Sequence, residues 1–167
     1  PRTEHPLIGI NGFYTHTDGV PRVEVRLAYA DAIQRAHGVP VVIPPIGAER
    51  EMRRFLGSLD GLVLSGGDDF DTARLGLGET HPDALVTPSS KQDFDMRLAE
   101  LAIEEGIPVL GICYGMQALA LCSPRKTPKG PQVAMEGASL LQHLPEDRPG
   151  CQEHGGRRLH PVRIAPG

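Results

Sequence analysis

The feature that most constrains this chain is an apolar run, residues 107–112, that ends at a cysteine between two glycines. Gly111-Ile112-Cys113-Tyr114-Gly115 has the G-x-C-x-G spacing of a nucleophile elbow, in which a strand turns sharply into a helix. Such a turn places Cys113 at a helix N-terminus, where unpaired backbone N–H groups favour a thiolate and can hold an oxyanion. The alternative is a small buried cysteine at the end of a core strand.

Composition limits the partners and the compartment. The 167 residues are enough for one domain with a substantial core. A net charge of −4 does not indicate a nucleic-acid footprint or a patch for anionic membranes, and no apolar stretch approaches the roughly 18–20 residues of a membrane span. The 3 cysteines are too few and too irregularly spaced for a disulfide framework, which indicates a reducing compartment. We therefore expect a cytoplasmic protein without nucleic-acid or membrane partners.

Short apolar segments alternate with amphipathic ones along the chain. We expect strands at 6–10, 39–43, 59–65 and 107–112, with helices at 21–38, 48–57, 94–106 and after Cys113. Residues 13–19 and 68–90 are expected to be loops, and Pro21 to lie in the first turn of the first helix. This alternation predicts an α/β fold in three layers, with a mostly parallel sheet and helices on both faces. Ligands bind at the carboxyl ends of such strands, so Gly66-Gly67 and Cys113 can face one another.

The pattern breaks after Cys122. Residues 121–132 are rich in proline and basic residues and predict an exposed inserted loop, so the preceding helix must end near Cys122. The spacing of Cys151 and His154 lacks the second ligand pair that a structural metal site needs. We therefore expect no metal and no cofactor. His160-Pro161-Val162-Arg163-Ile164 alternates as a strand would.

Taken together, these segments resemble the class I glutamine amidotransferase-like superfamily. Within it they are most similar to gamma-glutamyl hydrolase peptidases of the gamma-glutamyl-gamma-aminobutyrate hydrolase type. The matching segments are 6–10, 29–44, 59–67 followed by Asp69 and Asp71, 108–117, 139–144 and 160–162. The resemblance implies one flavodoxin-like domain over 1–167. In that family the catalytic histidine and glutamate follow the equivalent of Ile164, so we expect this domain to be C-terminally incomplete, truncated after Gly167.

The resemblance also implies roles for individual residues. Cys113 matches the nucleophile that forms a thioester with a small gamma-glutamyl substrate. The backbone N–H groups of Tyr114 and of Gly67, or alternatively Gly66, match the oxyanion hole. Gly66 and Gln117 match substrate-binding positions. Tyr114 replaces the arginine more usual in the hydrolase branch, which leaves substrate preference open.

Several alternatives remain open at this level. Asp69 and Asp71 fall beside the implied pocket, but turns and helix caps are an equal explanation for both. His154 and His160 are the candidates by position for a substitute base. The chain could instead be a catalytically incompetent fragment or binding scaffold of the same fold, or a glutaminase subunit of an amidotransferase. The amine half of the substrate and the oligomeric state, including a homodimer, are also open.

Overall fold

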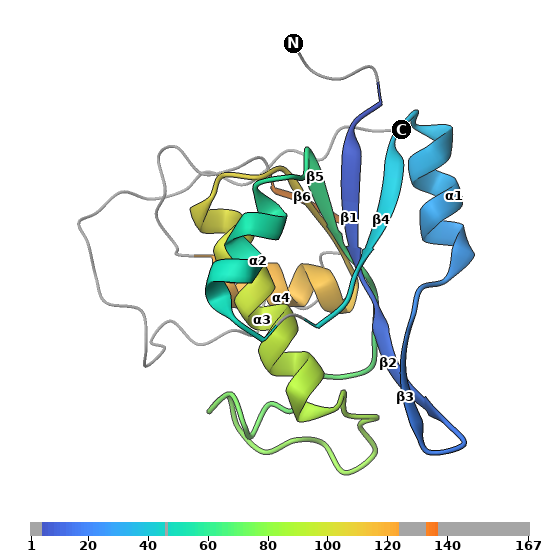
Figure 1. The fold of residues 1–167 in the computed structure, drawn as a ribbon. Helices are drawn as coiled ribbons and strands as arrows, with labels where there is room; N and C mark the ends of the chain where they lie inside the picture. Colours follow the sequence, from blue (N-terminus) through green and yellow to red (C-terminus); the bar gives the residue numbers. More distant parts are fainter. Residues whose placement is uncertain (1–4, 46, 124–132, 137–167) are drawn as a thin grey trace, which may run out of the picture.

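The computed structural model describes residues 5–45, 47–123 and 133–136, which form an α/β fold in three layers (Figure 1). The main sheet consists of β1 (Leu7–Asn11), β4 (Val39–Ile43), β5 (Gly61–Leu64), β6 (Val109–Ile112) and β7 (Val133–Glu136). One face carries α1 (Leu27–Arg35), and the other carries α2 (Glu49–Leu56), α3 (Ser89–Glu104) and α4 (Tyr114–Cys122). The predicted fold class is therefore confirmed.

The order of the strands shows where a ligand can bind. The sheet runs β4-β1-β5-β6-β7, and each neighbouring pair is parallel. Numbered within this sheet, the order is 2-1-3-4-5, which is that of flavodoxin-like folds. From β1 the chain passes to β4 on one side, whereas β5 and the later strands lie on the other side of β1. The switch point is therefore between β1 and β5, and ligands bind at such a point, beyond the carboxyl ends of the strands. Asn11 ends β1 and Ser65 follows β5, so both residues lie at this point.

Residues 13–24 form a β-hairpin, so the predicted loop at 13–19 and the helix start at Pro21 are wrong. Strand β2 (Phe13–Thr17) pairs antiparallel with β3 (Val20–Glu24). Asp18 and Gly19 join them with φ values of 53° and 75°, as a two-residue type I′ turn requires. Pro21 fits here because each strand of a two-stranded ribbon has one unpaired edge.

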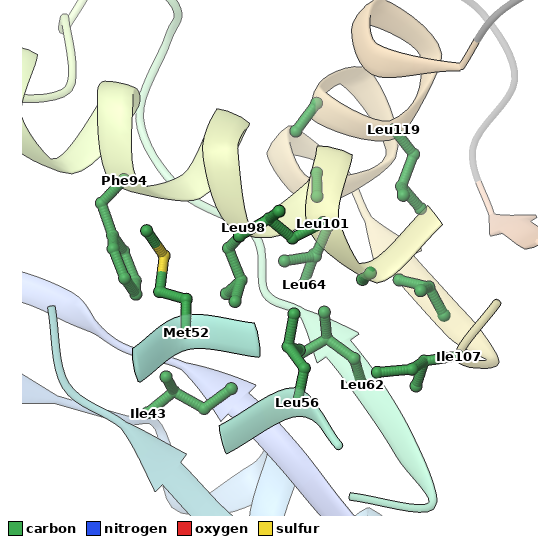
Figure 2. Packing of buried hydrophobic residues seen from close by; sticks show 14 of the residues in the cluster. Ile43, Met52, Leu56, Leu62, Leu64, Phe94, Leu98, Leu101, Ile107 and Leu119 are labelled. Carbon is green, nitrogen blue, oxygen red and sulfur yellow. The ribbon is translucent and has the colours of Figure 1, made fainter. Parts of the chain in front are cut away.

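Most of the described apolar core lies between the sheet and helices α2, α3 and α4 (Figure 2). Its members are largely aliphatic, as a sequence with only 4% aromatic residues requires. The side chains labelled in Figure 2 are Ile43, Met52, Leu56, Leu62, Leu64, Phe94, Leu98, Leu101, Ile107 and Leu119. A smaller cluster on the other face contains Ile10, Ile33 and Val63. The larger cluster therefore anchors α2, α3 and α4 to the sheet.

Element boundaries test the remaining sequence predictions. Helix α4 ends at Cys122 as predicted, so the first two residues of the predicted insertion at 121–132 are still helical. Strand β7 was not predicted. Several predicted features lie outside the described residues. They are residues 124–132 of the insertion, Cys151, His154, His160 and the predicted strand at 160–164. None of the described helices is long and apolar enough to cross a membrane.

The packing in Figure 2 predicts a large cost for truncating Leu98 of α3, which is 1% exposed. Leu98→Ala should lower the free energy of unfolding by about 2–5 kcal/mol, because it removes buried methyl groups and leaves a cavity. Urea unfolding followed by circular dichroism measures the change. The matched control is Leu85→Ala, at a side chain 75% exposed, which should change the free energy by less than about 0.5 kcal/mol. Equal effects of the two substitutions would contradict this packing.

Candidate active site

Cys113 lies at the turn between β6 and α4 with an unusual backbone conformation. Its φ is 49° and its ψ is −107°. A non-glycine residue at positive φ is strained and persists only where its surroundings hold it there. The cysteine is exposed, so the alternative of a buried core cysteine is wrong. The strand–turn–helix geometry expected of a nucleophile elbow is therefore present.

The two glycines that flank the cysteine allow close backbone packing. A Cβ on Gly115 would lie 2.1 Å from the carbonyl oxygen of Leu64, at the end of β5. A Cβ on Gly111 would lie 2.7 Å from the backbone nitrogen of Met116. Neither contact can be relieved by moving a side chain, because the neighbouring atoms belong to the backbone. Gly115 therefore lets the first turn of α4 pack directly against β5, and Gly111 lets the same turn pack against β6.

The strand end at Gly66-Gly67 lies beside the elbow, as the sequence predicted. A Cβ on Gly66 would lie 3.7 Å from Cys113 Cβ, and one on Gly67 would lie 3.3 Å from Tyr114 Cγ. Within the described part of the chain, the backbone N–H groups of Gly67 and Tyr114 have no hydrogen-bond acceptor. Two backbone N–H groups close to the elbow thus have no acceptor among the described residues.

Tyr29 of α1 is a site residue that the sequence analysis missed. Its hydroxyl accepts a hydrogen bond of 3.2 Å from the N–H of Gly66. Of the two glycines considered for an oxyanion hole, Gly67 is therefore the one whose N–H has no acceptor in the described part of the chain. The sequence indicated only that Tyr29 lies in the predicted helix at 21–38, because its hydrogen-bond partner lies 37 residues away in the sequence.

Tyr114 contributes its backbone to the site and its side chain to the core. The residue is 1% exposed, and its ring stacks on Phe70 with centroids 4.1 Å apart and planes 9° from parallel. Burial and the nearby charge of Asp95 raise the pKa of the Tyr114 hydroxyl well above its ordinary value. The side chain therefore stays neutral and is enclosed in the protein interior.

The remaining predicted residues fall into two groups. Gln117 is half-buried in the first turn of α4, and no hydrogen bond joins its side chain to another described residue, so its amide is available to a ligand. Asp71 instead accepts hydrogen bonds from the Arg74 N–H and the Thr80 hydroxyl, which hold the pKa of its carboxyl below the usual value. Asp69 accepts one from the N–H of Leu85. The two aspartates thus organise the loop after β5, which agrees with the turn explanation.

The close packing at the elbow predicts that Gly115→Ala disrupts it, because the added methyl group would collide with the Leu64 carbonyl. We expect the alkylation rate of Cys113 by iodoacetamide and the melting temperature both to change. Mass spectrometry and thermal unfolding measure the two effects. Gly47→Ala is the control, since a Cβ there would have no neighbour within 4 Å. A Gly115→Ala variant indistinguishable from this control would contradict the described turn.

Known proteins share this arrangement of segments. The sequence profile of the Peptidase C26 family matches residues 6–127. A protein of Rickettsia prowazekii described as glutamine amidotransferase-like is 27% identical over 150 residues, which cover 86% of this chain and 48% of the relative. A Mycobacterium tuberculosis protein with a glutamine amidotransferase name is 32% identical over 146 residues, covering 84% and 43% respectively.

A third relative has a more specific name. The gamma-glutamyl-gamma-aminobutyrate hydrolase of Escherichia coli K12 is 28% identical over 120 residues, which cover 71% of this chain and 46% of the hydrolase. The chain spans about half the length of the curated relatives that it matches. The match of the family profile includes the sheet from β1 to β6, the elbow and α4. The chain therefore belongs to the Peptidase C26 family, whose fold is of the class I glutamine amidotransferase-like type.

Proposed function

We propose that this protein is a cysteine hydrolase that cleaves gamma-glutamyl amide bonds through a thioester on Cys113. The observation that carries the proposal is an exposed thiol at a strained elbow, near which the N–H groups of Gly67 and Tyr114 have no acceptor among the described residues. Membership of a hydrolase family supports the reaction class, and the name of the Escherichia coli relative supports the gamma-glutamyl substrate.

The geometry suits a two-step acyl transfer. The Cys113 thiolate attacks the gamma-carbonyl carbon, so an S–C bond forms and the carbonyl oxygen becomes an oxyanion. The N–H groups of Gly67 and Tyr114 donate hydrogen bonds to that oxygen, and one such donor is typically worth about 10²–10³-fold in rate. Collapse of the intermediate breaks the C–N bond, and the amine leaves with a proton. Water then attacks the thioester, which releases glutamate and returns the thiol.

The proton transfers need a base. Of the described histidines, His5, His37 and His81 make no hydrogen bond to Cys113. His154 and His160, the candidates by position, lie outside the described residues, as does any segment equivalent to the one that supplies the family's histidine and glutamate. The proposal therefore assigns the base to a part of the protein beyond those residues.

The nucleophile is tested by substituting it. In the full-length protein, Cys113→Ala should lower glutamate release from gamma-glutamyl amides by about 10⁴-fold or more, because no other group forms the thioester. Cys122→Ala is the matched control, since that thiol points into the body of the protein and contacts the Met96 carbonyl at 3.4 Å. The control should retain activity within about twofold. Turnover by Cys113→Ala at the wild-type rate would refute the assignment.

A second candidate function is that of a glutaminase that supplies ammonia to a synthetase. The glutamine amidotransferase names of the Rickettsia and Mycobacterium relatives favour it. The two functions differ in the leaving group, which is ammonia for a glutaminase and a larger amine for the hydrolase. We expect higher kcat/KM on gamma-glutamyl derivatives of alkyl amines than on free glutamine. The reverse preference would favour the glutaminase, and Cys113 alkylation without any hydrolysis would favour an inactive scaffold.

A further inference from the structure

A buried ion pair lies beneath the candidate site. Lys91 and Asp95 are one turn apart on α3, and their ammonium and carboxylate are hydrogen-bonded while the side chains are only 4% and 1% exposed. Taking two charges out of water is expensive, so a buried pair is seldom more stabilising than apolar side chains of the same volume. Burial in fact raises the pKa of Asp95, although Lys91 and Asn11 oppose that shift. The pair therefore calls for an explanation other than stability.

On one side, the pair is linked to the end of β5. The Asn11 side-chain amide donates a hydrogen bond of 2.8 Å to Asp95. Its carbonyl oxygen accepts one of 2.7 Å from the backbone N–H of Ser65, and the Ser65 hydroxyl donates another of 3.0 Å to the backbone carbonyl of Asn11. Asn11 and Ser65 are both buried. Asp95 is thus connected through one side chain to the residue that precedes Gly66-Gly67.

On the other side, the pair is linked to the elbow. The Lys91 ammonium lies 5.6 Å from the ring centroid of Tyr114, and 5.6 Å and 5.8 Å from those of Tyr14 and Phe13 in the hairpin. These distances are within the range of cation–π attraction. Tyr114 directly follows Cys113, and its ring packs against Gly67. The Lys91 ammonium is therefore attracted to the ring of Tyr114, the residue whose backbone N–H directly follows Cys113.

We propose that Lys91, Asp95 and Asn11 are positioning residues that fix the N–H of Gly67 relative to the N–H of Tyr114. The inference rests on the proposed function, because it assumes that these two donors bind an oxyanion. A hydrogen-bonded ionic unit suits this task, since it has one preferred geometry where apolar side chains could repack. Misplacing a reacting group by about 1 Å can cost about 10²-fold in rate.

Two stoichiometric reactions of Cys113 distinguish the effect of the oxyanion hole from the intrinsic reactivity of the thiol. With p-nitrophenyl acetate the thiolate attacks the ester carbonyl, an oxyanion forms, and p-nitrophenolate leaves as the S–C bond replaces the C–O bond. With iodoacetamide the thiolate displaces iodide directly, and no oxyanion forms. The same protein carrying Cys113→Ala gives the background to subtract. The ratio of the acylation rate to the alkylation rate measures how strongly the oxyanion hole speeds acylation. The measurement requires no catalytic turnover.

We expect Lys91→Met and Asp95→Asn each to lower this ratio by about tenfold or more, as loss of aligned oxyanion donors would. The alkylation rate should change by less than about twofold, since the thiol itself is untouched. Lys91→Arg keeps the cation and should recover part of the ratio. The matched control is Arg97→Met, which breaks more exposed ion pairs of the same helix, those with Glu100 and Glu49, and should leave the ratio unchanged. A wild-type ratio in folded Lys91→Met would overturn the inference.

Removing one partner leaves a buried charge alone, so the single variants could fail to fold. The double variant Lys91→Met, Asp95→Leu removes both charges, and we expect it to fold with a lowered ratio. A wild-type ratio in this variant, or its failure to fold, would overturn the positioning role. The proposed function fails separately. If wild-type Cys113 shows only the ratio of a free thiol such as N-acetylcysteine, the oxyanion hole is absent and both proposals fall.

Discussion

The direct backbone contact between α4 and β5 is the constraint on which the rest of the candidate site depends. Because Gly115 has no side chain, the first turn of α4 lies against the Leu64 carbonyl, and the chain that continues to Gly66 and Gly67 runs beside the elbow. A side chain at that point would separate the two segments and, with them, the thiol from the opposite N–H donor. The glycine thus sets the distance between two halves of the site that are about 50 residues apart in the sequence.

The fold was largely predictable because its signals are local. Residues 39–43 and 107–112 are apolar runs with turn residues at their ends, and both contain strands close to the expected limits. The hairpin at 13–24 was missed because proline suits both a helix start and an edge strand. Asp18-Gly19 carried the competing signal, since Asp-Gly between two short strands favours a type I′ turn.

The site was predictable only in part. The spacing around Cys113 identified the elbow and its glycines, and the ends of parallel strands indicated Gly66-Gly67. Tyr29 and Asn11 could not be found in this way, because their hydrogen-bond partners lie 37 and 84 residues away in the sequence. Lys91 and Asp95 were hidden for another reason. A Lys and an Asp four residues apart on a helix usually form a surface pair, and only the tertiary structure shows that this one is buried.

The inward orientation of Tyr114 has a consequence for comparisons within the family. The resemblance left substrate preference open at position 114, since arginine is more usual there in the hydrolase branch. Here the side chain is enclosed by Phe70, Lys91 and the backbone at Gly67. A different side chain at position 114 would therefore have to fit against these neighbours. In this protein, position 114 thus reports how the core beside the elbow is packed.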